Sequence, residues 1–201
     1  DPKNMLLLQV ALMAEAMPFV QRFKLKAEKR QGFPIFANAD VRLVISGVGK
    51  TLAAAATAFL FATTDTKPTA FLNFGIAGHA HLPIGSIILG QKIQDRSAGK
   101  SYYPSLVFDS PCKTKNIVTV DMVCKDYQED CCYDMEAAGS LAAAGRFLPF
   151  EVIHSLKIIS DNKDQNTSHL SEKKIVQLIE EGWSFIHPVI EEILKIAQEF
   201  S

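Results

Sequence analysis

Three acidic residues stand where the sequence changes from one kind of segment to another. Glu15 and Asp161 each follow an apolar run typical of a buried strand, and Glu136 opens an alanine-rich segment. In α/β proteins the ligand-binding groups commonly lie just beyond the carboxyl ends of the strands. Carboxyl groups at such places can transfer protons or hold hydroxyl groups, so these three residues are candidates for acid–base chemistry.

Cleavage of an N-glycosidic bond is one reaction that needs such a set. The sugar becomes oxocarbenium-like as the bond breaks, and the departing base must be protonated to leave. An acid whose pKa is raised by burial can supply that proton, a second carboxylate can activate water, and a third can hold the sugar hydroxyls. Glycosidases that act on ordinary sugars divide this work between two carboxylates. By themselves, the residues show only acids at suitable junctions.

Structural interpretations fit the same residues. Alanine has the highest helix propensity, so the segment after Glu136 is predicted to be a tightly packed helix. Asp134 and Glu136 in its first turn would suit the helix dipole. Asp161, followed by Asn162, would also suit a turn that only caps the next element. The pattern leaves both interpretations open.

Composition narrows the class of protein. The chain has 201 residues, 48% of them hydrophobic, and a formal net charge of −1. This balance lacks the charge footprint of a nucleic-acid or membrane-surface binder, so a small-molecule partner is expected. The four cysteines have neither zinc-like spacing nor the density of a disulfide framework, which predicts a reduced, cytoplasmic protein with no metal and no cofactor.

Apolar runs and helical periodicity alternate along the chain. This order predicts one domain over 1–201, an α/β fold with a central mixed sheet in a three-layer α/β/α sandwich. The strands are expected at 6–12, 41–46, 69–74, 83–90, 117–120 and 150–159. A long final helix is expected from Ser171 onward, kinked or divided at Pro188. The polar stretch 92–111 is expected to be a loop that covers a pocket.

The segment 47–51, Gly-Val-Gly-Lys-Thr, is similar to the end of a phosphate-binding loop. That motif needs a glycine where Val44 stands, so the motif fails. The two glycines still allow a tight turn whose backbone N–H groups could face an anion. A plain connection between strand and helix fits equally well.

Several motifs resemble, in order, those of the nucleoside phosphorylase and nucleosidase family, especially its methylthioadenosine/S-adenosylhomocysteine nucleosidase branch. The resemblance spans most of the chain, from about residue 6 to 194. The motifs are ALMAEAMPFV at 11–20, SGVGK at 46–50, NFGIAG at 73–78 with IGSI at 84–87, DMEAA at 134–138 and ISDNKD at 159–164. The resemblance implies a phosphorylase/hydrolase-like fold and an N-ribosyl hydrolase acting on purine nucleosides of the methylthioadenosine or S-adenosylhomocysteine type.

The resemblance also implies roles for the matching residues. Asp161 would protonate or hydrogen-bond the purine, with Ser160 shaping that site. Glu136 would bind the ribose hydroxyls, with Met135 packing against the sugar, and Glu15 would polarise the nucleophilic water. The floor under ribose and base would be formed by Ile76, Ala77 and Gly78.

The chain departs from the family's pattern near the proposed base site. The segment that normally supplies an aromatic residue to stack on the purine is shortened to 121–124. The usual small hydroxyl residue is replaced by Ile76, a usual Asp by Ser86, and a small apolar pair by Asn162 and Lys163. The identity of the base and of the 5′ substituent therefore stays open.

Three functions remain in competition. The family's phosphorylases bind phosphate with arginines, including one just before the glycine that matches Gly75, and this chain has none there. Water is thus the expected nucleophile, although Arg42, Lys50 or Arg96 could compensate. The alternatives are a phosphorylase and a nucleoside-binding protein without turnover. The resemblance further implies a homodimer, in which an aromatic residue of 102–108 would reach the partner's pocket.

Overall fold

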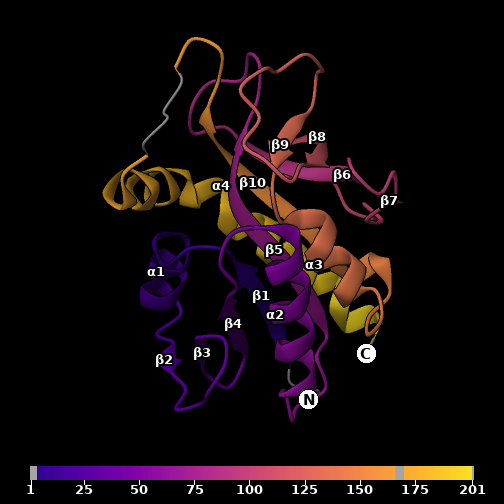
Figure 1. The fold of residues 1–201 in the computed structure, drawn as a ribbon. Helices are drawn as coiled ribbons and strands as arrows, with labels where there is room; N and C mark the ends of the chain where they lie inside the picture. The colour runs from indigo at the N-terminus through magenta and orange to yellow at the C-terminus, as the bar shows by residue number, and fades with distance from the viewer. Residues whose placement is uncertain (1–3, 166–169, 201) are drawn as a thin grey trace.

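The apolar runs form the central strands of one mixed sheet. The computed structural model describes residues 4–165 and 170–200, and its ten strands form a single sheet (Figure 1). The strands are β1 (Leu6–Val10), β2 (Lys26–Ala27), β3 (Ile35–Ala37), β4 (Val41–Ile45), β5 (Ala70–Gly78), β6 (Ile87–Asp95), β7 (Ser101–Tyr102), β8 (Lys113–Thr119), β9 (Cys132–Asp134) and β10 (Ile153–Asp161). The helices are α1 (Met13–Arg22), α2 (Lys50–Ala62), α3 (Ala137–Ala144) and α4 (Glu172–Glu199), with a 3₁₀ turn at Phe150–Val152.

Four parallel strands bring two of the predicted acids to one edge of the sheet. β1 pairs with β4 and β5, and β5 pairs with β10, all in parallel. β1 leads directly into α1, β5 ends at Gly78 and β10 ends at Asp161. Because parallel strands end at the same edge, Glu15 in α1 and Asp161 lie at the carboxyl edge of this part of the sheet.

Beside the parallel strands, the strand pairing forms a closed circuit of five strands, β5, β10, β6, β8 and β9. β10 also pairs antiparallel with β6, β6 pairs with β8, β8 with β9, and β9 pairs with β5 through Gly78 and Tyr133. In Figure 1, β6, β8 and β9 lie in the upper part of the molecule, above α2 and α3. The circuit places Asp134, at the end of β9, next to the end of β5.

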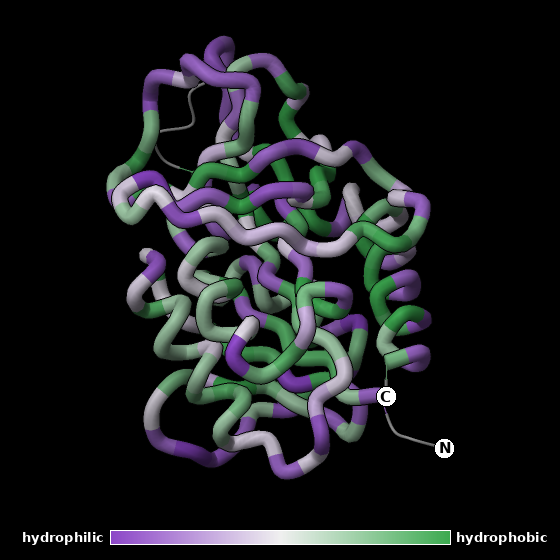
Figure 2. The backbone as a smooth tube through the Cα atoms, turned by 90° about the vertical axis from the view of Figure 1, so that its right-hand side faces the viewer, coloured by the Kyte–Doolittle hydropathy of each residue, from purple (hydrophilic) through white to green (hydrophobic). Residues whose placement is uncertain are grey.

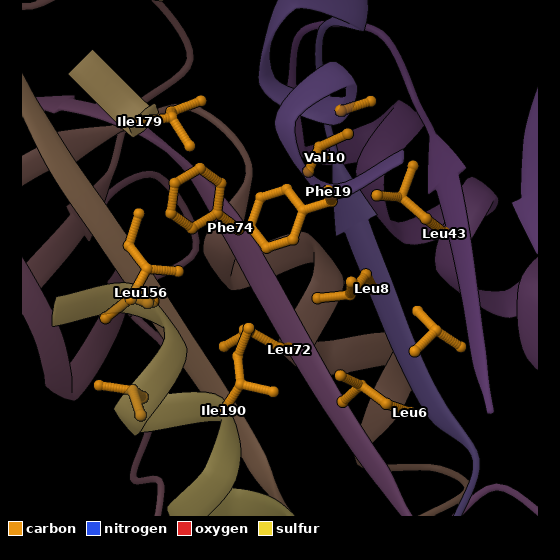
Figure 3. Packing of buried hydrophobic residues seen from close by; sticks show 14 of the residues in the cluster. Leu6, Leu8, Val10, Phe19, Leu43, Leu72, Phe74, Leu156, Ile179 and Ile190 are labelled. Atoms are coloured by element: carbon orange, nitrogen blue, oxygen red, sulfur yellow. The ribbon is translucent and has the colours of Figure 1, made fainter. Parts of the chain in front are cut away.

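Two hydrophobic clusters flank the sheet. One joins side chains of α1 and α4 to the sheet, and the other joins side chains of α2 and α3 to the sheet. Figure 3 shows Phe19 of α1 against Phe74 of β5, with Ile179 and Ile190 of α4 nearby. The two phenylalanine rings are 4.9 Å apart and meet edge to face, a favourable geometry for an aromatic pair. Figure 2 shows hydrophobic segments running through the interior and hydrophilic segments at many outer turns.

A buried polar network attaches α3 to the strands beneath the site. The side-chain amide of Gln9 donates to Ser46 at 2.9 Å and its carbonyl accepts from Asn73 and from Ser140, each at 2.6 Å. Ser155 donates to the Asn73 carbonyl oxygen at 2.6 Å. Since buried polar groups are costly when unpaired, this network fixes the position of α3, which begins directly after Glu136.

Several local predictions were wrong. Asp134 ends strand β9, and Glu136 is the residue before α3, so neither lies in a first helical turn. The stretch 92–111 is not a loop throughout, because β6 continues to Asp95 and β7 follows. Helix α4 runs through Pro188 without interruption, so of the two alternatives, a kink or a division, the division is wrong.

The six predicted strands correspond to β1, β4, β5, β6, β8 and β10, with ends that differ by up to five residues. The short strands β2, β3, β7 and β9 were not predicted. All four cysteines are unpaired. Within residues 4–165 and 170–200, no helix has the length and apolar character needed to cross a membrane. In that same part of the chain, no three His, Cys, Asp or Glu side chains are grouped so that they could hold a metal ion.

Candidate active site

A cavity of about 220 Å³ lies at the carboxyl edge of β1, β5 and β10. It is smaller than the roughly 300–1,000 Å³ typical of drug-sized ligand sites, which suits a ligand of nucleoside size. All eight residues that the sequence analysis selected line this one cavity. They are Glu15, Ile76, Ala77, Gly78, Met135, Glu136, Ser160 and Asp161.

Glu15 is held rigidly at the floor of the cavity. One of its carboxylate oxygens accepts from the backbone N–H groups of Ala11 at 3.1 Å and Leu12 at 2.9 Å, and the other accepts from Ile76 at 2.8 Å. The residue is almost fully buried. Burial raises its pKa, while the three N–H groups and the ammonium of Lys157 oppose that rise. Glu15 is therefore a carboxyl group held in a fixed position in the first turn of α1.

The carboxylate of Asp134 contacts both the start of α3 and buried groups beneath the site. Its Oδ2 accepts from the backbone N–H of Glu136 at 3.1 Å and of Ala137 at 2.7 Å, as the side chain of a helix cap does. Its Oδ1 accepts from the hydroxyl of Thr119 at 2.6 Å. Lys157 Nζ also forms an ion pair with Asp134 Oδ2 at 2.9 Å. The backbone that precedes α3, and with it Glu136, is thereby held in place.

Glu136 reaches from the start of α3 across the cavity to the turn before α2. Its Oε2 accepts from the backbone N–H of Gly49 at 2.8 Å. Burial, and then the negative charge of Asp134, raise its pKa to about 7, against the opposing effects of Lys157 and of the Gly49 hydrogen bond. The sequence analysis allowed a tight turn at 47–49 whose N–H groups could face an anion. In the structure, that anion is the carboxylate of Glu136 in the same chain.

Lys157 is a buried charged residue beside the site that the sequence analysis missed. It lies in β10 with a side chain that is fully buried, beneath the cavity and against Asp134. Burial opposes its charged form, but Asp134, Glu136 and Glu15 together raise its pKa, so the ammonium is retained. A lone lysine inside an apolar strand was the available signal, because lysine is almost never fully buried unless it is paired.

Asp161, the last residue of β10, lines the cavity. Its Oδ1 accepts from the Ser160 hydroxyl at 2.9 Å. Burial raises its pKa, which favours the protonated form that an acid catalyst needs. Ser160 is itself buried and its hydroxyl also contacts the carbonyl of Ala77 at 3.4 Å.

Two glycines of β5 leave the space that these groups occupy. A Cβ on Gly75 would stand 2.8 Å from Glu15 Oε2 and 3.4 Å from Lys157 Nζ. A Cβ on Gly78 would stand 2.8 Å from Asp161 Oδ2. Only glycine therefore lets the strand pass this close to the acidic side chains.

The segment 121–131, between β8 and β9, supplies one wall of the cavity. Val123, Cys124 and Tyr127 line it, so the shortened segment still contributes an aromatic residue. Tyr127 is buried and packs against Tyr133, with ring centroids 5.6 Å apart. The lining also includes the apolar residues Leu12 and Val48.

The cations that could have bound phosphate are engaged elsewhere. Arg42 makes a two-pronged contact with Glu28, at 2.9 and 2.8 Å. Lys50 pairs with Asp95 at 2.8 Å, and Arg96 pairs with Glu129 at 2.6 Å. Among the described residues, no arginine or lysine lines the cavity.

The comparisons with known proteins give the class of fold. The fold is that of the 5′-methylthioadenosine/S-adenosylhomocysteine nucleosidases, and the fold predicted from the sequence motifs is confirmed at this level. No protein-family model and no curated protein sequence matches the chain.

Particular solved structures resemble the chain over nearly its full length. The apo 5′-methylthioadenosine nucleosidase of Arabidopsis thaliana is 18% identical with a TM-score of 0.78, covering 96% of this chain and 97% of its own. The Colwellia psychrerythraea nucleosidase in complex with adenine is 17% identical with a TM-score of 0.74, covering 98% and 96%. The futalosine hydrolase of Helicobacter pylori is 15% identical with a TM-score of 0.75, covering 94% and 98%.

Proposed function

We propose that this chain is an N-ribosyl hydrolase that cleaves the glycosidic bond of a purine nucleoside. One observation carries the proposal: Glu15, Glu136 and Asp161, from three distant parts of the sequence, line a single cavity of nucleoside size. The reaction needs a proton donor at the base, a proton acceptor for water and an anchor for the ribose. The cavity offers one carboxyl group for each task.

In this mechanism Asp161 protonates the purine and Glu15 takes a proton from water. The bond between C1′ and N9 breaks as the bond between C1′ and the water oxygen forms. The proton of Asp161 passes to the base, which leaves neutral, and the water proton passes to Glu15. Glu136 accepts hydrogen bonds from the ribose hydroxyls. The excess of carboxylates over the single buried ammonium of Lys157 favours the positive charge that develops on the ribosyl group.

Water is the nucleophile in this proposal. A phosphate ion would need paired cationic donors inside the cavity. Arg42, Lys50 and Arg96 all have acidic partners elsewhere. Lys157, beneath the cavity, is already paired with Asp134 at 2.9 Å. Phosphorolysis therefore has no built site among the described residues.

The substrate class follows from the apolar residues of the lining and from the comparisons. Leu12, Val48 and Val123 would favour an apolar 5′ substituent over a charged one. The nucleosidases of similar fold are named for methylthioadenosine and S-adenosylhomocysteine, and the Helicobacter pylori relative for futalosine. We place methylthioadenosine, whose 5′ substituent is apolar, first among the substrates, and S-adenosylhomocysteine, whose homocysteine part is charged, after it.

The assay measures release of free base. The protein is incubated with methylthioadenosine, S-adenosylhomocysteine, adenosine, inosine and futalosine, each with and without phosphate. Hydrolysis predicts base and free ribosyl product without phosphate. Release that requires phosphate would instead establish a phosphorylase, and binding without release would establish a nucleoside-binding protein.

The proposal includes a cytoplasmic homodimer of one domain over 1–201, with a three-layer α/β/α arrangement. The two clusters on opposite sides of the sheet support the three layers. The resemblance implies that an aromatic residue of 102–108 reaches the partner's pocket, and Tyr103 in this stretch is exposed. Sedimentation at micromolar concentration tests it, and a monomer would contradict the dimer.

A further inference from the structure

Tyr127 occupies an unusual position for a residue of an irregular segment. It belongs to 121–131, which has no helix and no strand, yet only 5% of its surface is exposed. Its ring packs in a small cluster with Val118, Cys131 and Tyr133. Its hydroxyl points over Gly78, where a Cβ would overlap it.

The Tyr127 hydroxyl and a carboxylate oxygen of Asp161 border the same small space. The position of a Cβ on Gly78 is 2.8 Å from Asp161 Oδ2 and closer still to the Tyr127 hydroxyl. Both residues line the cavity. Among the described residues, none forms a hydrogen bond with the Tyr127 hydroxyl, so this hydroxyl can hydrogen-bond a ligand. Asp161 Oδ1 is already held by Ser160, which leaves Oδ2 facing this space.

A contact outside the cavity holds the segment that carries Tyr127. His79 follows β5 and is buried, and its Nδ1 accepts from the backbone N–H groups of His81 at 3.0 Å and Leu82 at 3.1 Å. The ring proton therefore lies on Nε2, which donates to Asp130 at 3.0 Å. Lys115 also binds Asp130, at 2.9 and 2.8 Å. These contacts fix Asp130 near the end of the segment 121–131, and so hold in place Tyr127, which lies three residues earlier.

We propose that Tyr127 recognises the exocyclic group at C6 of the purine, which its hydroxyl hydrogen-bonds, while Asp161 hydrogen-bonds N7. This inference rests on the proposed function, because it takes Asp161 as the acid at N7. The groups at N7 and C6 are neighbours on one edge of a purine, as the two oxygens are neighbours over Gly78. A phenolic hydroxyl both donates and accepts, so it binds a 6-oxo group as donor and a 6-amino group as acceptor. The pocket should therefore accept both adenine-type and hypoxanthine-type nucleosides.

The test compares three ribosides that differ only at C6: adenosine, inosine and purine riboside, which has hydrogen there. Tyr127→Phe removes the hydroxyl and keeps the ring. We expect kcat/KM to fall roughly 3- to 10-fold for adenosine and for inosine, the effect of one lost hydrogen bond. For purine riboside we expect the variant and the wild type to agree within about twofold.

Tyr133→Phe is the matched control, because it removes a hydroxyl from the same cluster that accepts from the backbone N–H of Glu129 at 3.3 Å. Any change in this control should be equal for the three ribosides. An equal change for all three in Tyr127→Phe, or no change, would overturn the inference and leave the hydrolase proposal intact.

Binding separates this inference from the proposed function. Calorimetry with free adenine, hypoxanthine and purine measures the same C6 dependence without turnover. Suppose that the wild type releases no base, while Tyr127→Phe lowers the affinity for adenine and hypoxanthine and leaves the affinity for purine unchanged. The hydrolase proposal then fails, and the role of Tyr127 in recognising the C6 group stands. If the wild type neither turns over ribosides nor binds any base, both are refuted.

Discussion

Replacing Lys157 with methionine should destabilise the protein by an amount that grows with pH. Lys157 is fully buried and lies 2.9 Å from Asp134, with Glu136 and Glu15 close enough to raise its pKa. Removing one partner of a buried ion pair typically costs about 3–5 kcal/mol, because the other charge stays buried without compensation. Three hydrogen bonds to Asp134, from Thr119, Glu136 and Ala137, remain to offset part of this cost. We therefore expect about 3 kcal/mol near pH 8.

The pH dependence follows from the glutamates. In the wild type, the pKa of Glu136 is raised to about 7 from its ordinary value of 4.5. A raised pKa contributes stability that is fully present below the unfolded value and is lost as the pH rises through the folded value. Lys157 lowers the pKa of Glu136 and of Glu15, so its removal raises both and extends that loss to higher pH. Near pH 5 more of these carboxyls are protonated, and the cost of the substitution should shrink to about 1–2 kcal/mol.

Urea denaturation measures the effect near pH 5 and near pH 8. Trp183 packs against Phe19 at 5.3 Å and reports unfolding by fluorescence. Lys195→Met is the control, because Lys195 is 67% exposed and its pair with Glu192 should contribute under about 1 kcal/mol. Asp134→Asn combined with Lys157→Met should recover part of the lost stability. A cost for Lys157→Met that matches the control, or that is the same at both pH values, would refute the reasoning.

Three further predictions concern turnover, affinity and packing. Asp161→Asn should lower kcat about 10²- to 10⁴-fold with an unchanged far-UV circular dichroism spectrum; a rate within tenfold of the wild type would remove Asp161 as the acid. Nucleoside affinity should increase as the pH rises through about 7, because ionised Glu136 accepts hydrogen bonds from ribose, and calorimetry should show Glu136→Gln without this rise. Gly139→Ala should destabilise the protein by about 1–3 kcal/mol, because its Cβ would overlap the Lys50 carbonyl; an unchanged melting temperature would contradict this packing.

The sequence was sufficient for the long central strands and for the positions of Glu15 and Asp161. Continuous apolar runs identify β1, β5 and β10, and an acid just after such a run must lie at the carboxyl edge of a parallel sheet. Glu15 and Asp161 therefore could be placed from local pattern. Their common cavity depends on the pairing of β1, β5 and β10, which brings together residues far apart in the chain.

Features that depend on distant pairing escaped the local pattern. The segment around Asp134 was predicted to be helical, because the alanines that follow favour helix. It is a strand, because Tyr133 pairs with Gly78 of β5 and with Val118 of β8. Tyr127 gave no periodic signal, since its position depends on the contact of Asp130 with His79.

Asp134 performs two tasks with one carboxylate, and this restricts how related sequences can change. The same oxygen caps the helix that follows Glu136 and neutralises the buried Lys157. If a related protein lost Lys157 and kept Asp134, the aspartate would be a buried anion without compensation. If that protein also lost Asp134, the helix would lose its cap. Positions 134 and 157 should therefore vary together across descendants of this protein, with an uncharged capping residue at 134 wherever 157 is neutral.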